Sequence, residues 1–217
     1  MLFLVLGLVI IAGVSYFLGS VNVALILSRK VKGDDVREHG SGNAGTTNML
    51  RTFGWRAGAM TFLGEILKGV IAVIIGRTVL SYMGYEAYAV YGGYLGGISS
   101  LIGQMFPIYF GFKGGKGVAA ALGAVCALNP VLFLILCAAG FSLAAITGYV
   151  SAGSVTGAAI YPVLVLVKML LSGTFNILEL VLAIILGGLL LISHRENIKR
   201  LLNGTENKLS PSKKEKK

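Results

Sequence analysis

Charged residues and cysteines are both scarce in this chain. Only 13% of its 217 residues are Asp, Glu, Lys or Arg, whereas 55% are hydrophobic, and the mean hydropathy is +0.81. A soluble domain of this length could not bury so much apolar surface, so the composition predicts an integral membrane protein. The 31 glycines agree with closely packed transmembrane helices.

The two cysteines, Cys126 and Cys137, lie in apolar stretches without metal-ligand spacing. We therefore expect buried thiols, no disulfide framework and no metal site. Acidic residues are few as well, nine against nineteen Lys and Arg, which gives a net charge of +10. Because the cations gather at the ends of apolar segments, membrane lipids explain them better than nucleic acid does.

Long apolar runs predict an all-α protein with about seven transmembrane helices, since one spanning helix needs about 20 residues. The first run is too long for a signal peptide and lacks a basic start, so we expect an uncleaved span. Asn129 and Pro130 should separate two contiguous spans, because proline removes a donor and disfavours helix in the residue before it. The predicted spans are 2–27, 55–77, 87–109, 117–129, 130–148, 152–171 and 176–193.

Lysine and arginine alternate between the two sides of these spans. They concentrate after the first span, after the third span and in the C-terminal segment. The positive-inside rule then predicts an external N-terminus and a cytosolic C-terminus, which an odd number of spans requires. We expect a single membrane domain over residues 1–207 and a basic, disordered cytosolic tail over residues 208–217.

The first of three polar clusters runs over residues 40–51 and contains a G-x-G-x-x-G pattern. A charged loop precedes it instead of a buried strand, which argues against a dinucleotide site. Backbone N–H groups freed by glycine can bind an anion, Ser41 and Asn43 can donate to phosphate oxygens, and Arg51 can grip one bidentately. A flexible loop is the alternative.

The second cluster, Gly114 to Gly117, surrounds Lys116 at the start of a predicted span. It is not a Walker A loop, because Phe110 stands where glycine is needed and Gly117 where Ser or Thr is needed. A lysine beside free N–H groups at a helix start predicts a second anion site. An ordinary positive loop would also explain it.

The third cluster, His194 to Glu206, follows the last span. Its leucines and isoleucine suggest a short interfacial helix on which His194, Asn197 and Arg200 share one face. The pKa of histidine lies near neutrality by default, so His194 can act as a general base or as a cationic donor. A plain basic helix beside the membrane is the alternative.

Two further features fall inside the apolar segments. Glu65 and Lys68 lie three residues apart in a predicted span, and intramembrane charges usually pair, so we expect an ion pair near the site. Ser151 and Ser154 lie at a cytosolic span junction and could reach the same pocket.

Together the three clusters resemble the motifs of the bacterial acylphosphate:glycerol-3-phosphate acyltransferase family, the PlsY family. They occur in the family's order, and the resemblance covers the whole chain. It implies a multi-pass protein of the bacterial inner membrane with cytosolic motifs and no cofactor. Such an enzyme transfers a fatty acyl group from acyl phosphate to the 1-hydroxyl of sn-glycerol 3-phosphate, giving lysophosphatidic acid and phosphate, the first step of phospholipid biosynthesis.

The resemblance also implies partners and roles for individual residues. We expect a monomer that is functionally linked to an acyl-phosphate-producing enzyme. The catalytic residues would be His194, Lys116 and Asn197. Glycerol 3-phosphate would bind Ser41, Arg51, Lys116, His194 and Asn197; acyl phosphate would bind Gly42, Asn43, Thr47, Gly114, Gly115 and Gly117; and the supporting residues would be Asn48, Ser151, Arg200, Gly204 and Glu206.

The chemistry expected from the residues is compatible. Phosphate is already a good leaving group, so the glycerol hydroxyl can attack directly without an acyl-enzyme, and its proton passes to His194 or to a phosphate oxygen of the donor. An organic-phosphate transporter is the alternative, although its anion groups would lie near the bilayer midplane. A lipid-binding protein would need only the basic tail. The His-x₄-Asp motif of soluble-type glycerolipid acyltransferases is absent from the sequence.

Overall fold

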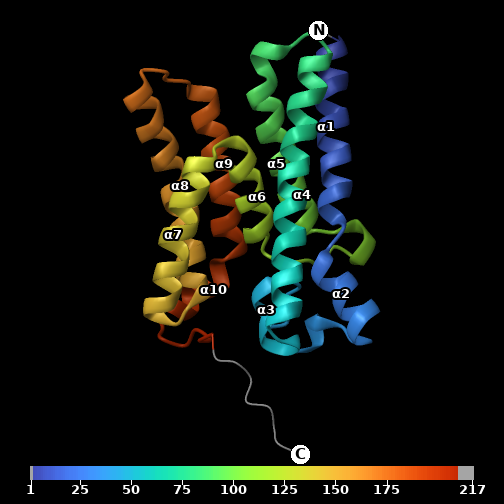
Figure 1. Cartoon of the computed structure of the whole chain (residues 1–217), viewed down its shortest axis with the longest axis vertical. Coiled ribbons are helices and arrows are strands. Elements are labelled where there is room, and N and C mark those ends of the chain that lie inside the picture. Colours follow the sequence, from blue (N-terminus) through green and yellow to red (C-terminus); the bar gives the residue numbers. More distant parts are fainter. Residues whose placement is uncertain (1, 210–217) are drawn as a thin grey trace, which may run out of the picture.

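The computed structural model describes residues 2–209, and every regular element in that range is helical (Figure 1). The predicted all-α class is therefore confirmed. Three short 3-10 helices cover Val36–Glu38 (η1), Glu86–Tyr88 (η2) and Ile108–Phe110 (η3). The α-helices are α1 (Leu2–Ser20), α2 (Val23–Lys32), α3 (Thr46–Phe53), α4 (Trp55–Tyr82), α5 (Ala89–Met105), α6 (Val118–Leu128), α7 (Pro130–Thr147), α8 (Val150–Ser172), α9 (Ile177–Ser193) and α10 (Arg195–Leu202).

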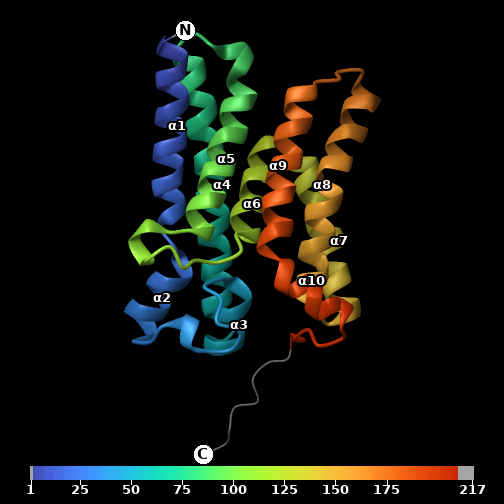
Figure 2. The same ribbon diagram turned by 180° about the vertical axis from the view of Figure 1, so that it is seen from behind.

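The long helices form two groups, and their axes are roughly aligned, with consecutive helices of each group pointing in opposite directions. Figures 1 and 2 show α1, α4 and α5 together on one side and α7, α8 and α9 on the other, with the short helix α6 between them. The short helices α2, α3 and α10 all lie at the end of the molecule opposite the N-terminus. Residues 40–51 and 194–206, far apart in sequence, therefore lie at the same end of the molecule.

Several segments are long and apolar enough to cross a membrane. Four such segments are Leu2–Val31, Trp55–Tyr82, Pro130–Thr147 and Val150–Ser172, and α9 with α10 makes a fifth if that pair, bent by 62°, counts as one span. The helix α6 is apolar but much shorter. These segments agree with a multi-pass membrane protein.

The first predicted span, residues 2–27, is interrupted in the structure. Helix α1 ends at Ser20 and α2 begins at Val23. Asn22 causes the break, because its side-chain oxygen caps α2 by accepting a hydrogen bond from the N–H of Leu25 at 3.0 Å. Its amide nitrogen donates to the carbonyl oxygen of Ala44 at 3.3 Å. One polar residue in an apolar run hardly changes its mean hydropathy, which is why the run reads as continuous.

The predicted break between α6 and α7 is confirmed. Asn129 caps α7 through its side-chain oxygen, which accepts from the N–H of Leu132 at 3.1 Å, and Pro130 occupies the first turn, where its missing N–H costs little. Asn176 caps α9 in the same way, through the N–H of Glu179 at 3.0 Å. Three asparagines thus set helix starts inside a largely apolar chain.

Glycines let the helices approach each other closely. A Cβ atom at Gly69 of α4 would lie 2.0 Å from the carbonyl oxygen of Ala120 on α6, and one at Gly123 of α6 would lie 2.0 Å from that of Ile66. Neither contact leaves room for a side chain. The expectation of closely packed glycine-rich helices is confirmed.

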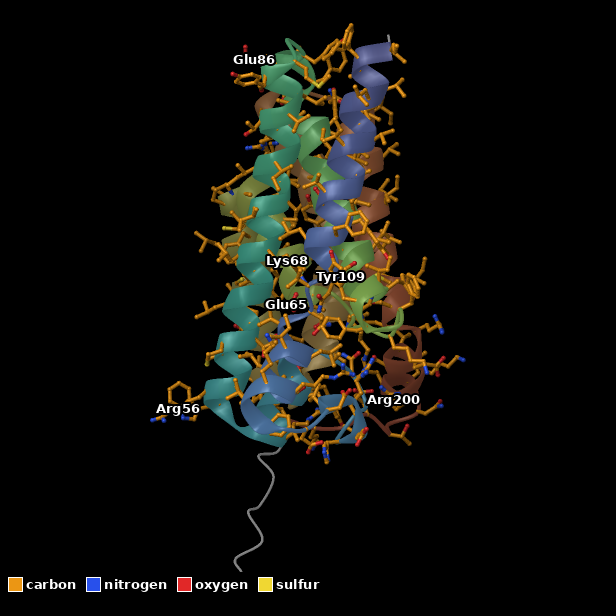
Figure 3. All side chains as sticks on the ribbon, turned by 90° about the vertical axis from the view of Figure 1, so that its right-hand side faces the viewer. Arg56, Glu65, Lys68, Glu86, Tyr109 and Arg200 are labelled. Carbon is orange, nitrogen blue, oxygen red and sulfur yellow. The ribbon has the colours of Figure 1, made fainter. Side chains whose placement is uncertain are left out.

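Glu65 and Lys68 form the predicted ion pair, midway along α4 (Figure 3). The Lys68 Nζ lies 2.6 Å from the Glu65 Oε2, and both side chains are almost fully buried. The pair also completes hydrogen bonds at the break between α1 and α2. Its further partners are the carbonyl oxygens of Gly19 and Val21, at 2.8 Å and 3.0 Å from Lys68 Nζ, the Gln104 side-chain oxygen, and the N–H of Val23, at 2.9 Å from Glu65 Oε1.

We expect Lys68→Met to destabilise the protein strongly. The change leaves a buried carboxylate and two buried carbonyl oxygens without their donor, which typically costs about 3–5 kcal/mol. Thermal unfolding of the detergent-solubilised protein would measure it. Lys168→Met is the matched control, because Lys168 pairs with Glu179 at 3.3 Å near the surface, where such a pair contributes about 0–1 kcal/mol. Equal effects of the two changes would contradict this account.

Candidate active site

The helices α3 and α10 lie at the same end of the molecule (Figure 1). Residues of both helices line a cavity of about 690 Å³. All three polar clusters contribute to its mouth, and its inner part runs between α4, α6, α7, α8 and α9. Figure 3 shows nitrogen-bearing side chains gathered near Arg200 at this end. The polar cluster residues that line it are Ser41, Asn43, Thr46, Thr47, Asn48, Arg51, Lys116, His194, Asn197, Arg200 and Glu206.

A chain of polar contacts joins the second and third clusters. Lys116 Nζ donates to the side-chain oxygen of Asn197, whose amide nitrogen donates to Glu206 Oε1 at 2.9 Å. Arg200 Nε donates to Glu206 Oε2 at 2.8 Å. Although burial opposes ionisation, hydrogen bonds from Asn197 and Arg200 hold the pKa of Glu206 below its usual range. Glu206 therefore stays a carboxylate that offsets part of the local positive charge.

Lys116 has an unusual electrostatic environment for a lysine. Burial lowers its pKa to about 8, and the nearby cations Arg200 and Arg51 act in the same direction, whereas Glu206 opposes them. The amine remains mostly protonated at neutral pH but loses its charge soon above it. An anion bound at this position would stabilise the charged form.

His194 stands between α9 and α10 and is almost fully buried. Its Nδ1 lies 2.8 Å from the carbonyl oxygen of Leu190, which can only accept, so Nδ1 carries the proton and Nε2 is left as an acceptor. Burial lowers the pKa of His194 to about 4, with Lys116 acting in the same direction and the Leu190 carbonyl opposing. The ring is therefore neutral at physiological pH, which argues against the cationic-donor alternative.

Asn48 shapes the loop of the first cluster. Its buried side-chain oxygen accepts from the N–H of Ser41 at 3.0 Å, and its amide nitrogen donates to the carbonyl oxygens of Val36 and His39 at 2.8 Å and 2.9 Å. Gly40 has a φ of 58°, and a Cβ atom there would lie 2.3 Å from the Asn48 oxygen. The loop therefore turns tightly around Asn48 and leaves the exposed Ser41 at the cavity mouth.

Helix α3 begins at the cavity wall, although the sequence predicted only a glycine-rich loop there. Gly45, Thr46 and Thr47 line the cavity, and no side chain caps this helix start. The first N–H groups of a helix lack internal partners and favour an anion. Arg51 follows on the same helix, lines the cavity and donates to the carbonyl oxygens of Asn207 and Lys208 at 3.1 Å and 3.3 Å.

The structure revises the expectation for three glycines. The N–H groups of Gly42, Gly114 and Gly115 donate to the carbonyl oxygens of His39, Met105 and Gln104, at 2.9, 3.2 and 3.1 Å. None of the three is among the residues that line the cavity, whereas Gly117 is. These glycines therefore shape the loops instead of offering free donors.

Position 115 in the second cluster has room only for glycine. A Cβ atom there would lie 2.4 Å from the carbonyl oxygen of Ala44, in the first cluster's loop. The two loops thus pack backbone against backbone, and this contact brings Lys116 next to the first cluster.

The remaining supporting residues lie around the mouth. Ser151 lines the cavity, and its buried Oγ has no hydrogen-bond partner among residues 2–209. Gly204, with a φ of 69°, does not line the cavity but turns the chain after α10. The predicted tail begins with residues that pack against the site: the N–H of Leu209 donates to the carbonyl oxygen of Gly148 at 2.8 Å. Its residues 210–217 lie outside the described part.

The apolar inner part of the cavity was not predicted residue by residue. It is lined by small residues such as Gly157 and by large ones such as Phe62, whose ring centroid lies 6.2 Å from that of Phe141. Phe141 is 59% exposed, so the cavity reaches the lipid-facing surface between α4 and α7. Gly153 and Gly157, two small residues four positions apart on α8, were the sequence signal that could have indicated this inner part of the cavity.

One cavity thus combines a cationic mouth with a long apolar interior. That combination suits an amphiphile with a phosphate at one end and a hydrocarbon chain at the other. Residues 2–209 contain no group of three or more His, Cys, Asp or Glu side chains that could hold a metal ion.

Comparisons with known proteins agree with this geometry. The sequence pattern of a family described as glycerol-3-phosphate acyltransferase matches residues 9–204. A glycerol-3-phosphate acyltransferase of Clostridioides difficile (strain 630) is 46% identical over 206 residues, which are 94% of this chain and 97% of that protein. One of Halalkalibacterium halodurans is 40% identical over 208 residues, 96% of this chain and 98% of that protein.

Two solved structures share the fold. Both are crystal structures of PlsY, an integral membrane glycerol 3-phosphate acyltransferase, one in its glycerol 3-phosphate form and one in its lysophosphatidic acid form. Each is 33% identical in sequence and covers 93% of this chain and 94% of that chain, with TM-scores of 0.79 and 0.75.

Proposed function

The chain belongs to the glycerol-3-phosphate acyltransferase family, and we propose that it transfers a fatty acyl group from acyl phosphate to the 1-hydroxyl of sn-glycerol 3-phosphate. The products are lysophosphatidic acid and inorganic phosphate, and the reaction begins phospholipid biosynthesis. The observation that carries the proposal is the cavity of about 690 Å³, which joins a cationic mouth to an apolar groove. Both substrates carry phosphate, and only one carries a long chain.

In this proposal the mouth provides two sets of side chains and N–H groups, one for the phosphate of each substrate. Ser41, Arg51, Lys116 and Asn197 hold glycerol 3-phosphate, with His194 facing its hydroxyl. Asn43, Thr47 and Gly117, together with the uncapped start of α3, surround the acyl phosphate. Gly42, Gly114 and Gly115 keep these groups in place through their loop contacts.

The chemistry is a direct displacement at the acyl carbon. The glycerol oxygen attacks the carbonyl carbon, the bond from that carbon to the phosphate oxygen breaks, and phosphate leaves. N–H groups of α3 or the Asn43 amide stabilise the developing oxyanion, each worth about 3 kcal/mol if well placed. The hydroxyl proton passes to the neutral Nε2 of His194 or to an oxygen of the departing phosphate.

The membrane arrangement follows from the charge distribution. We place the N-terminus outside and the C-terminus in the cytosol of a bacterial inner membrane, with seven crossings formed by α1 with α2, α4, α5, α6, α7, α8 and α9. The short helices α5 and α6 cross as shielded spans, which protein neighbours allow. The site then opens to the cytosol, where an acyl-phosphate-producing enzyme supplies the donor, and the protein acts as a monomer.

Product formation by the purified, detergent-solubilised protein tests the proposal. We expect turnover of glycerol 3-phosphate with palmitoyl phosphate and none with palmitoyl-CoA. Arg51→Ala and Lys116→Ala should each lower kcat/KM by about tenfold to a hundredfold, because each removes a charged hydrogen bond. Arg56→Ala and Lys113→Ala are matched controls, since neither residue lines the cavity. Turnover with palmitoyl-CoA alone, or with neither donor in a folded protein, would refute the proposal.

The lowered pKa of Lys116 predicts that the activity falls at alkaline pH. Its charge is present below a pKa of about 8 and disappears above it, so kcat/KM for glycerol 3-phosphate should fall as the pH rises through about 8. Lys116→Arg should retain residual activity and lose this alkaline fall, because an arginine stays charged. The measurement is kcat/KM from pH 7 to pH 9.5 at constant ionic strength. A flat wild-type profile over that range would contradict it.

A variant of His194 distinguishes the two candidate acceptors of the hydroxyl proton, the His194 ring and the phosphate of the acyl donor. A general base contributes about 10²–10⁴ in rate, so His194→Ala should lower kcat at saturating substrate at least tenfold if Nε2 takes the proton. His39→Ala is the control, because His39 contacts Asp34 at 2.6 Å and does not line the cavity. A loss far below tenfold would leave the donor phosphate as the base.

A further inference from the structure

Tyr161 of α8 lies at the inner end of the apolar groove, and behind it lies a second buried tyrosine, Tyr94 of α5. Their hydroxyl oxygens lie 3.1 Å apart, and each residue is 2% exposed. A buried phenol needs a hydrogen-bond partner, and each of these two supplies the other's. The pair therefore forms a fixed cross-link between α5 and α8 at the inner end of the groove.

Tyr161 separates two cavities of different character. On one side it lines the groove, and on the other it lines, with Tyr94, a second cavity of about 150 Å³. Charged side chains line that second cavity, among them Arg77 and the ion pair of Lys168 with Glu179. A hydrocarbon end cannot satisfy polar groups that it would strip of water, so it gains little by passing the tyrosine pair.

The depth of the groove fits one membrane acyl chain. Ser151 lies at the mouth and Tyr161 at the inner end, ten residues apart on the same helix. At about 1.5 Å per residue this separation is about 15 Å. The hydrocarbon core of a bilayer is about 30 Å thick and holds two layers of chains, so one chain spans about half of it.

Small side chains keep the groove open between these two points. A Cβ atom at Gly157 would have only Leu136 Cδ2 within 4 Å, at 3.9 Å, so the space beside Gly157 is free. Ser154 and Ala158 line the groove on either side of it. The missing side chain at 157 keeps the groove wide, whereas the ring of Tyr161 ends it.

We propose that Tyr161, held in place by Tyr94, is the stop that sets the longest acyl chain this protein accepts. The inference rests on the acyl transfer proposed above, and it assigns a specificity role to a residue outside the three polar clusters.

Transfer rates with a series of donors test the inference. The purified protein would receive lauroyl, myristoyl, palmitoyl, stearoyl or arachidoyl phosphate with glycerol 3-phosphate, and kcat/KM would be measured for each. Tyr161→Ala should move the preferred donor at least one step toward longer chains. It should raise the arachidoyl-to-palmitoyl ratio about tenfold or more, since one methylene in an apolar pocket changes selectivity by about 10–200-fold.

A second variant tests the groove from the other direction. Gly157→Leu should move the preferred donor toward shorter chains, because its side chain enters the free space beside Leu136. Tyr161→Phe should keep the wild-type profile, since its ring still fills the end of the groove. Val163→Ala is the control on the same helix, because Val163 is 56% exposed and does not line the groove.

An active Tyr161→Ala variant with the wild-type profile would overturn the inference. If that variant does not fold, an unchanged profile in Gly157→Leu would overturn it instead. Failure of the proposed function is distinguishable from both, because the wild-type protein would then transfer no acyl group from any donor in the series.

Discussion

The buried ion pair of Glu65 and Lys68 is the contact on which the arrangement of the site depends. A helix broken inside a membrane exposes backbone groups that lipid cannot satisfy. Here the chain breaks between α1 and α2, and the charged pair on α4 supplies donors and an acceptor to the carbonyl oxygens of Gly19 and Val21 and to the N–H of Val23. Two charges stay buried because each is paired and hydrogen-bonded.

This network extends directly into the loops of the site. Gln104 accepts from Lys68 through its side chain and from the N–H of Gly115 through its carbonyl oxygen. At the break itself, Asn22 donates to the carbonyl oxygen of Ala44. The first and second clusters are therefore attached to the same buried polar centre, and their loops pack against each other at Gly115. Rigid support of this kind keeps the polar groups of the cavity mouth in position.

The location of the site at the end of an apolar groove determines its electrostatics. A site that holds a hydrocarbon chain next to a phosphate must be partly buried, and burial disfavours charge. That cost appears in the lowered pKa values of Lys116 and His194. Glu206, which pairs with Arg200 at 2.8 Å, offsets part of the local positive charge. Anionic substrates complete the balance.

The amino-acid sequence by itself determined the helical class, most helix boundaries and the three polar clusters. Apolar runs of spanning length, asparagine and proline at helix starts and charges at span ends are local signals, and Asn129 with Pro130 was correctly identified from them. The ion pair of Glu65 and Lys68 was also predictable, because two charges one helical turn apart in an apolar segment have few other partners.

Only the tertiary structure decided which cluster residues face the cavity. Gly42, Gly114 and Gly115 resemble anion-binding glycines in sequence, but their N–H groups are used by neighbouring loops that the sequence does not reveal. The break at Asn22, the start of α3 and the tyrosine pair depend likewise on contacts between distant residues. The groove is formed by side chains of five helices, and its end at Tyr161 is determined by how those helices pack, which no local pattern encodes.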